Sequence, residues 1–326
     1  MSKQNRRVST SGDLEVSTYL EIAKEKGGQQ SQSIQSTEGI SEGVAVIDFG
    51  SQYNMLIMRR IRESQVYCEL FAPNSTWEEV KHINPKGVIL SGGPASVYDD
   101  GAPLIPEWVF EHNLPILGIC YGMQALAHQL GGRVVPSIKR EYGHAILKRA
   151  NEETPIFAGL PSSMPVWMSH GDQITNLPPG FQSLAYTENS PVAVMGNNDA
   201  IFGLQFHPEV VHTPQGMEIL KNFLEQVCGC QRNWTADNVV NASIARIQEQ
   251  VGKGRVLCAL SGGVDSAVVA SLIHRAIGDQ LTCIFVNNGL LRREEPERVL
   301  KAFEASYDSK NMPRMHLIYV DATQRF

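Results

Sequence analysis

Short apolar segments alternate with longer amphipathic ones along the chain from residue 44 onward. The first apolar runs are nearly continuous and rich in β-branched residues, and they cover residues 44–49, 66–71, 87–91 and 115–119. The stretches between them, such as 52–64 and 77–83, carry apolar residues at helical spacing. Strands that are apolar on both faces and alternate with helices are typical of a parallel sheet that helices cover on both sides. We therefore predict an α/β fold for this part of the chain.

The pattern changes in the middle of the chain and then starts again. It weakens into mixed strands and turns over 133–206, returns in a helix over 214–227, and gives way to a polar segment at 228–238. A second α/β pattern follows, with helices expected over 239–251, 265–277 and 294–306 and strands over 255–261, 281–289 and 315–320. These strands are too few for a complete nucleotide-binding α/β domain, so we expect the second domain to be incomplete at its C-terminus.

These patterns divide the chain into four parts. Residues 1–42 are rich in Ser, Gln, Gly and Lys and poor in apolar runs, which predicts a disordered extension. We expect the first α/β domain over 43–229, a linker over 230–241, and the beginning of a second α/β domain over 242–326.

The charge balance and the hydropathy exclude several classes of protein. The 326 residues include 28 Lys and Arg against 34 Asp and Glu, for a net charge of −6, and no long stretch is strongly basic. A protein that coats nucleic acid is therefore not expected. No apolar run approaches the roughly 18 residues that a membrane span needs, and the N-terminus lacks the apolar core of a secretion signal. The six cysteines are scattered without CxxC spacing, which is typical of a reducing compartment, so we expect a cytoplasmic protein.

A cysteine stands at the junction of a predicted strand and a predicted helix. The motif GICYG at 118–122 ends the strand expected over 115–119 and opens a helix over 123–130. A nucleophile between two glycines on such a turn has a strained backbone, and the missing Cβ atoms of the glycines relieve the clashes. The thiol of Cys120 would stand near a helix N-terminus, whose dipole favours a thiolate. A lone cysteine is more often a buried structural residue, but the glycines and the strand-to-helix context favour a nucleophile here.

A thiolate nucleophile needs a proton acceptor and a group that orients the acceptor. The segment QFHPE at 205–209 offers both, as His207 and Glu209. Side chains two residues apart in an extended segment point to the same face, so Glu209 can hold one ring nitrogen while the other meets Cys120. His-Pro-Glu alone is a weak signal, because His beside Pro is common in loops. Together with the GICYG turn it predicts a Cys–His–Glu triad.

Acyl transfer also needs hydrogen-bond donors for the developing oxyanion. The motif SGGP at 91–94 follows the strand expected over 87–91, at the carboxyl end where folds of this class place their sites. We expect the backbone N–H groups of Gly93 and Tyr121 to be the donors. An ordinary glycine-proline turn is the alternative for 91–94 taken by itself.

A glycine-rich loop joins a strand and a helix of the second domain. It has the sequence SGGVDSA at 261–267. Glycines let backbone N–H groups close on an anion, the helix N-terminus adds its dipole, and Ser hydroxyls donate. The loop lacks the Lys-Ser/Thr pair of a Walker A motif, so it is not the usual NTPase loop. Asp265 is a candidate magnesium ligand, and a capped glycine turn without a ligand is the alternative.

Several of these motifs together resemble a known family. GICYGMQ, SGGP, WMSHGD and QFHPEV occur in the order and at the spacing of class I glutamine amidotransferase domains. IDFGSQY, REYG and HTPQGMEIL narrow the resemblance to the amidotransferase half of the GMP synthase family. The resemblance covers about 43–326. It implies a flavodoxin-like amidotransferase domain followed by part of an adenine-nucleotide alpha-hydrolase-like ATP pyrophosphatase domain.

The resemblance implies a role for each member of the triad. Cys120 would attack the carboxamide of glutamine and form a glutamyl thioester, with release of ammonia. His207 would protonate the leaving amine and then activate water, and Glu209 would orient His207.

The resemblance also implies a binding site for glutamine. The residues that would hold its amino-acid end are Gln124, Ser169, His170, Gly171 and Asp172. Asp172 would act through the ammonium group. Without the resemblance, the SHGD segment would rank as an ordinary polar loop.

In the second domain the resemblance implies ATP and Mg²⁺ as cofactors. SGGVDS matches the pyrophosphate loop of enzymes that cleave ATP to AMP and pyrophosphate while they adenylate a substrate. The implied ATP-binding residues are Ser261, Gly262, Gly263, Val264, Asp265, Ser266 and Ala267. The family reaction adenylates XMP, and ammonia then displaces AMP to give GMP. This chain has Asn287 where the family usually has Asp, which removes a negative charge near the nucleotide.

Two other functions stay open because the second domain is expected to be incomplete. The chain could be a glutaminase that supplies ammonia to a partner, or a non-catalytic fragment that binds glutamine or a synthetase partner. The intact triad favours catalysis, whereas the short second domain argues against ligation by this chain alone. The expected partners are therefore glutamine, XMP and ATP, with no nucleic acid and no membrane. A homodimer is expected for the full-length family, through a region that this sequence lacks.

Overall fold

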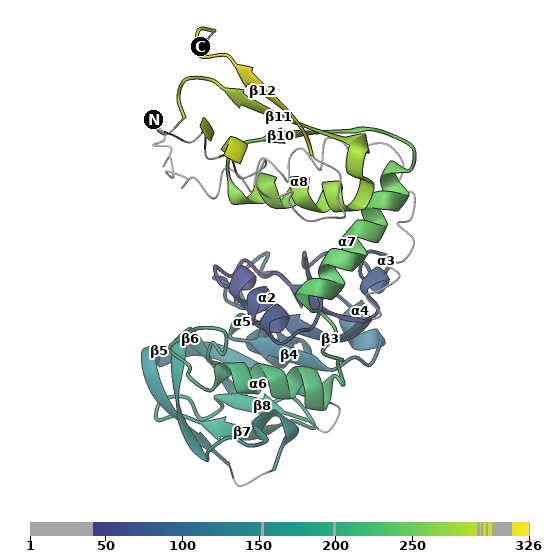
Figure 1. The fold of residues 1–326 in the computed structure, drawn as a ribbon. Coiled ribbons are helices and arrows are strands. Elements are labelled where there is room, and N and C mark those ends of the chain that lie inside the picture. The colour runs from purple at the N-terminus through teal and green to yellow at the C-terminus, as the bar shows by residue number, and fades with distance from the viewer. Residues whose placement is uncertain are drawn as a thin grey trace. The chain divides into compact units, whose positions relative to one another are not determined.

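A computed structural model gives the fold of this chain. It describes residues 42–325 apart from 151–152, 198–199, 292–293, 295, 298 and 302–314. The extension expected over 1–42, except its last residue, and most of the helix expected over 294–306 lie outside the described residues. The described residues form a nine-stranded sheet and a three-stranded sheet, each with its own helices (Figure 1).

The large sheet has a parallel half and an antiparallel half, in the order β2-β1-β3-β4-β9-β8-β7-β5-β6. The parallel strands are β1 (Gly43–Ile47), β2 (Cys68–Phe71), β3 (Pro85–Leu90), β4 (Ile116–Ile119) and β9 (Ile201–Leu204). The antiparallel strands are β5 (Arg133–Arg149), β6 (Ser163–Asn176), β7 (Gln182–Tyr186) and β8 (Val194–Gly196). The four apolar runs thus form parallel strands, as the sequence predicts. The weakly patterned region 133–206 supplies the antiparallel half and the fifth parallel strand.

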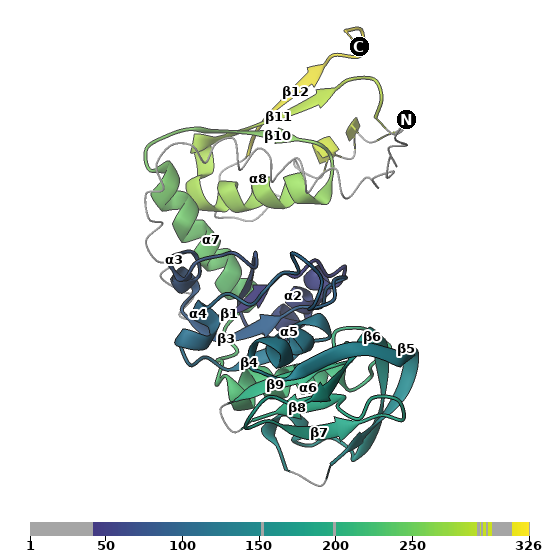
Figure 2. The same ribbon diagram turned by 180° about the vertical axis from the view of Figure 1, so that it is seen from behind.

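Helices cover both faces of the parallel half, which explains why its strands are apolar throughout (Figure 2). Along β1, Val44 belongs to one buried cluster and its neighbour Ala45 to another. The cluster of Val44 includes residues of α2 (Asn54–Glu63) and α6 (Gly216–Asn222). The cluster of Ala45 includes residues of α3 (Trp77–Val80), α4 (Trp108–Glu111) and α5 (Tyr121–Gln129). Short helical turns are η1 (Lys81–Ile83), η2 (Pro155–Phe157) and the π-helical η3 (Phe223–Val227).

The two long strands β5 and β6 pair with each other and carry the SHGD segment. Their ladder places Glu141 opposite His170 and Tyr142 opposite Ser169, and its register shifts between Pro136 and Glu141. Strand pairing therefore brings the REYG motif directly beside SHGD, although the two motifs are far apart in the sequence.

The small sheet contains β10 (Val256–Leu260), β11 (Leu281–Asn287) and β12 (His316–Asp321), parallel and in that order. Its helices are α7 (Ala236–Val251), α8 (Val264–Ile277) and the short turn η4 (Gly278–Gln280). α7 begins earlier than the expected 239, because the side chain of Thr235 caps it by accepting a hydrogen bond from the N–H of Asn238. Within the described ranges, no helix combines the length and the apolar character that crossing a membrane requires.

Candidate active site

Cys120 lies on a sharp turn between β4 and α5. Its backbone has φ 51° and ψ −103°, a conformation that non-glycine residues rarely adopt. A Cβ on Gly118 would lie 2.6 Å from the backbone of Gly122, and a Cβ on Gly122 would collide with the carbonyl oxygen of Leu90. The strained turn and the need for both glycines are thus confirmed. The N–H of Cys120 donates to the carbonyl of Leu204 at 2.7 Å, which fixes the turn against β9.

His207 and Glu209 form a buried pair immediately after β9. Nδ1 of His207 lies 2.7 Å from Oε1 of Glu209, and the two residues are 5% and 0% exposed. The backbone of His207 is held on both sides, since its N–H donates to Trp167 and its carbonyl accepts from the hydroxyl of Thr213. The expectation that both side chains point to the same face is confirmed.

The ring of His207 also meets the sulfur of Cys120. A Cβ on Gly92 would lie 3.3 Å from Cε1 of His207 and 3.8 Å from Cβ of Cys120, so this glycine keeps open the space where the two side chains meet. Burial by itself lowers the pKa of His207. The hydrogen bonds to Cys120 and Glu209, and the charges of both groups, outweigh burial and raise the pKa to about 10. His207 is therefore held as an imidazolium near neutral pH.

The two expected oxyanion donors lie next to the nucleophile. Gly93 and Tyr121 line the same cavity as Cys120. A Cβ on Gly93 would approach the carbonyl oxygen of Phe49 to 2.6 Å, so the chain can turn here only with glycine. Within the described part of the chain, no hydrogen bond uses the N–H of Gly93 or Tyr121. Both groups are thus available to a ligand.

The cavity has a volume of about 620 Å³. Every residue expected to hold glutamine lines it, namely Gln124, Ser169, His170, Gly171 and Asp172. The lining also includes Ser96, Tyr98 and Asp99, which the sequence did not single out, and Arg140 and Tyr142 of the REYG motif. His207 and Glu209 are not among the residues that line the cavity, but His207 contacts Cys120, which is.

Hydroxyl groups, and no cation, hold the carboxylate of Asp172. Oδ2 accepts a hydrogen bond from Oγ of Ser96 at 2.5 Å, and Oδ1 accepts one from the hydroxyl of Tyr98 at 2.6 Å. Burial and the hydrogen bond to Asp172 raise the pKa of Tyr98. No ion pair to Asp172 occurs among the described residues. Its negative charge therefore stays uncompensated at the wall of the cavity.

The side chain of His170 is turned into the protein. Nδ1 lies 2.8 Å from the carbonyl oxygen of Asp172, and Nε2 lies 3.3 Å from Oε2 of Glu141. The hydroxyl of Thr187 donates to the same carboxylate at 2.9 Å. Both ring nitrogens are thus occupied, so His170 supports the shape of the SHGD segment through its side chain rather than offering that side chain to a ligand.

Two amide side chains connect this segment to the nucleophile. Nε2 of Gln124 donates to Oε1 of Gln205 at 3.3 Å and to the carbonyl of Asp172 at 3.4 Å. Nε2 of Gln205 lies 3.8 Å from Sγ of Cys120, which itself lies 3.6 Å from the carbonyl of Ser169. Gln205 was part of a motif in the sequence, but its place beside the sulfur follows only from the packing of β9 against β4.

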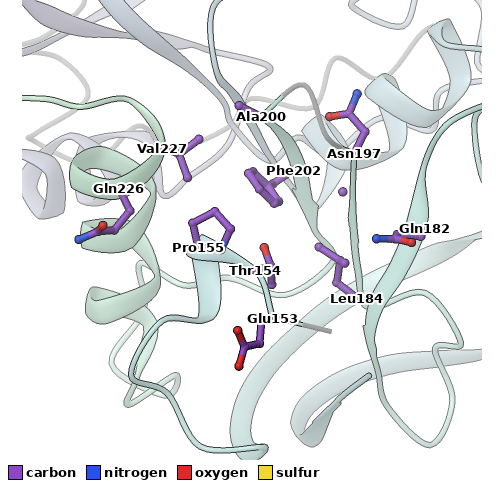
Figure 3. A pocket seen from close by; sticks show the side chains of 11 residues that line it. Glu153, Thr154, Pro155, Gln182, Leu184, Asn197, Ala200, Phe202, Gln226 and Val227 are labelled. Carbon is purple, nitrogen blue, oxygen red and sulfur yellow. The ribbon is translucent and has the colours of Figure 1, made fainter. Parts of the chain in front are cut away.

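A second hollow, of about 300 Å³, lies at the amino end of β9, opposite the end that leads to His207 (Figure 3). Leu184 and Phe202 form its apolar wall, and Thr154 and Pro155 face them. The described residues of its lining include no thiol and no imidazole. Among the described residues, a thiol therefore lines the first cavity and not this one.

The glycine-rich loop of the second domain connects β10 to α8. Gly262 has φ +81°, and the hydroxyls of Ser261 and Ser266 lie 3.1 Å apart across the loop. Ser261 to Asp265 are exposed, so the helix N-terminus and the loop are open to an anion. Asp265 lies in the first turn of α8, beside the loop. This arrangement fits a phosphate group and one carboxylate ligand for its magnesium ion.

The carboxyl ends of the neighbouring strands carry two further polar residues. Asn287 ends β11 and lies opposite Asp321, which ends β12. The side-chain amide of Asn287 donates to the hydroxyl of Tyr319 at 3.1 Å, a hydrogen bond that an Asp at this position could not donate. The described residues contain no cluster of three or more His, Cys, Asp or Glu side chains that could hold a metal ion by themselves.

Comparisons with known proteins cover both parts of the chain. The family model for glutamine amidotransferase class-I matches residues 45–227, and the model for the tRNA methyl transferase HUP domain matches residues 254–311. A protein of Dehalococcoides mccartyi named GMP synthase (glutamine-hydrolyzing) is 60% identical over 94% of this chain. A protein of the same name from Thermomicrobium roseum is 57% identical over 87% of this chain.

The matched proteins differ in length from this chain. The alignments cover 57% and 53% of the two bacterial proteins, so the chain spans about half the length of the curated relatives it matches. A crystal structure from Thermoplasma acidophilum, of a protein provisionally assigned as one of the subunits of GMP synthase, is 33% identical with a TM-score of 0.53. That match covers 94% of the solved chain and 58% of this one.

Proposed function

The chain belongs to the class I glutamine amidotransferases, and on this basis we propose that its residues 43–229 hydrolyse glutamine to glutamate and ammonia. The observation that carries the proposal is the contact series Cys120–His207–Glu209 beside a cavity with two unused N–H donors. A strained nucleophile, a positively charged acid and an oxyanion site are the groups that thioester formation requires.

In the first half of the reaction, Sγ of Cys120 attacks the carboxamide carbon of glutamine. The N–H groups of Gly93 and Tyr121 donate to the oxygen, which becomes negative as the tetrahedral intermediate forms. The imidazolium of His207 gives its proton to the amide nitrogen, the C–N bond breaks, and ammonia leaves a glutamyl thioester on the sulfur. His207 ends this half-reaction neutral.

In the second half, neutral His207 takes a proton from water, and the resulting hydroxide attacks the thioester. Glutamate leaves, and the proton on His207 restores the ion pair with the sulfur. The geometry suits this exchange of roles, because the hydrogen bond and the charge of Cys120 are part of what raises the pKa of His207. Acylation removes the charge on sulfur, so the pKa of the ring falls toward the range in which a general base works near neutral pH.

Glutamine is proposed to bind with its ammonium group on Asp172. The carboxylate at the cavity wall is oriented by Ser96 and Tyr98 and lacks a cation among the described residues, which supports this role. Gln124, Ser169 and Gly171 would shape the rest of the site through the side chains and carbonyls that line the cavity. His170 would contribute by holding the segment in place.

The products of the purified chain test this proposal. With glutamine, Mg–ATP and XMP present, we expect glutamate and ammonia in equal amounts. The absence of glutamate would contradict the proposal. AMP and GMP formed together with glutamate would extend the activity of this chain to ligation, whereas glutamate without AMP would restrict it to glutamine hydrolysis.

For the longer protein we propose glutamine-dependent amination of XMP to GMP, with ATP cleaved to AMP and pyrophosphate. The names of the relatives and the match to a HUP domain support this proposal. Residues 242–326 would contribute the loop 261–267, whose N–H groups and hydroxyls would hold the pyrophosphate part of ATP. Mg²⁺ would neutralise part of the charge of the phosphates there, with Asp265 as a ligand.

We also propose a homodimer and a cytoplasmic location for that longer protein. The location is in keeping with the free cysteines throughout the described residues.

Asp265→Asn is expected to weaken the binding of Mg–ATP about 10-fold or more, because the amide keeps the size of the side chain but removes the negative charge. Isothermal titration with Mg–ATP measures the effect. Asp237→Asn is a matched control, since Asp237 occupies the first turn of α7, a helix without a glycine-rich loop before it. Equal losses of affinity in the two variants would contradict the proposed role of Asp265.

A further inference from the structure

The cavity beside Cys120 contains one basic side chain, that of Arg140. No other Lys or Arg belongs to its described lining. The side chain of Arg140 makes no ion pair or hydrogen bond within the described part of the chain. The carboxylate of Asp172 in the same cavity is held by two hydroxyls and is not paired with Arg140. The lining therefore presents a negative and a positive group that are separate from each other.

The fold fixes the position of Arg140 relative to Asp172. Arg140 immediately precedes the resumed β5–β6 ladder, in which Glu141 lies opposite His170. A Cβ on Gly171 would lie 3.8 Å from Nε and 4.0 Å from Cδ of Arg140. These are ordinary van der Waals distances, so the side chain of Arg140 passes close to Gly171, the residue next to Asp172. Buried contacts of Glu141 with His170 and Thr187 hold this part of the hairpin in place.

Such a pair of separate charges matches the head group of an α-amino acid. The ammonium and the carboxylate of glutamine leave the same carbon atom, so a site that binds both needs an anion and a cation that do not neutralise each other. A guanidinium binds a carboxylate through two parallel hydrogen bonds, which adds direction to the attraction. Asp99, the other carboxylate of the lining, accepts a hydrogen bond from the N–H of Ser96 and supports the loop that holds Asp172.

We propose that Arg140 binds the α-carboxylate of glutamine, opposite Asp172 on the ammonium group, and so makes the site selective for a free α-amino acid. This inference rests on the proposed glutaminase function and adds a residue to it. Strand pairing places the REYG motif beside the SHGD segment, so Arg140 of the first and Asp172 of the second can contact the same glutamine molecule.

Substrates that lack one charged group test the proposal. 4-Aminobutanamide has the amide and the amine of glutamine but no carboxylate, and glutaramate has the amide and the carboxylate but no amine. We expect the unmodified chain to prefer glutamine to 4-aminobutanamide in kcat/KM. In Arg140→Ala this preference is expected to fall roughly 10- to 100-fold, because the variant loses the charge-assisted hydrogen bonds to the carboxylate. The preference for glutamine over glutaramate is expected to persist in Arg140→Ala, because Asp172 is intact.

The ratio of two substrates on one preparation cancels any loss of folded enzyme. Lys148→Ala is the matched control, because Lys148 is an exposed cation of β5 outside this cavity, and we expect it to keep both preferences. Arg140→Lys is expected to recover only part of the preference, since an ammonium group cannot form two parallel hydrogen bonds. An unchanged preference for glutamine over 4-aminobutanamide in Arg140→Ala would overturn the proposal and leave the glutaminase function standing.

A measurement without turnover separates the two proposals. Iodoacetamide alkylates a reactive Cys120, and bound L-glutamate is expected to slow this reaction in the unmodified chain and in Lys148→Ala. Protection is expected to need roughly 10- to 100-fold more glutamate in Arg140→Ala. If the chain failed to hydrolyse glutamine but showed this difference, the proposed function would be wrong and the carboxylate site would stand. Equal protection of Arg140→Ala and the unmodified chain would overturn the carboxylate site.

Discussion

Alanine in place of Cys120 is expected to lower the rate of glutamate formation by about 10³-fold or more. The substitution removes the sulfur atom that would form the thioester in the proposed mechanism, the one thiol of the described cavity lining. It leaves the turn intact, because alanine meets the same backbone strain at φ 51° as cysteine, and the relieving glycines on both sides remain. The loss should therefore appear in kcat without unfolding of the domain.

Chromatographic measurement of glutamate checks this expectation, with circular dichroism to monitor the fold. Cys228→Ala is the matched control, because Cys228 is a half-buried cysteine that does not line the cavity. Retention of more than about a tenth of the activity in Cys120→Ala would show that another group attacks the substrate.

Alanine in place of Glu209 is expected to reduce kcat/KM for glutamine about 10²- to 10⁴-fold. Oε1 of Glu209 holds the ring of His207, and Oε2 makes no hydrogen bond among the described residues, so the imidazolium is the principal partner of this buried carboxylate. Removal of the carboxylate takes away a hydrogen bond and a charge that both raise the pKa of His207. Burial lowers the pKa of His207, and without Glu209 less opposes this effect, so the pKa of His207 falls.

The pH dependence of this loss distinguishes an electrostatic role from a structural one. The pKa of His207 in the unmodified chain is about 10, so its imidazolium persists over the whole neutral range. In the variant the pKa of His207 is lower, so the ring loses its proton within that range. The ratio of the two rates should therefore grow between about pH 6 and pH 9. Glu209→Gln is expected to lie between the two, since it keeps an acceptor but no charge. Glu218→Ala, at an exposed position of α6, serves as the control. A ratio that is constant with pH would indicate that Glu209 acts only on the packing around His207.

Local features of the sequence were enough to predict the turn at Cys120 and the contact between His207 and Glu209. The nearly continuous apolar runs predicted β1 to β4 because strands between two helical layers have no polar face. The GICYG motif specified the turn at Cys120, since the two glycines and the nucleophile are within five positions of one another. His207 and Glu209 could be paired for the same reason: alternation along an extended segment sets their direction.

The contacts that complete the proposed glutamine site could not be predicted in this way. Ser96 and Tyr98 reach Asp172 across 76 and 74 positions of sequence, and neither lies in a pattern that indicates such a contact. They meet because the loop after β3 and the end of β6 lie at the same cavity. Contacts between segments so far apart in the sequence depend on the order of the strands in the sheet. Apolar periodicity does not specify that order.

The position of Arg140 and the orientation of His170 have the same cause. Both depend on the register of the β5–β6 ladder, which contains a shift just before Glu141. A shift of one strand by one residue would move every side chain of that strand to the opposite face of the sheet. The resemblance seen in the sequence implies that His170 helps to hold the amino-acid end of glutamine. In the structure its two ring nitrogens contact Asp172 and Glu141, so its side chain holds the segment itself.

Trapping of the glutamyl thioester tests the central claim most directly. The chain is mixed with radiolabelled glutamine and quenched in acid, free glutamate is measured in the same sample, and the labelled protein is digested into peptides. We predict label on the peptide that contains Cys120, released by hydroxylamine as expected for a thioester, together with free glutamate. Glutamate formed without acid-stable label on that peptide, or label on a different residue, would contradict the assignment of Cys120 as the nucleophile.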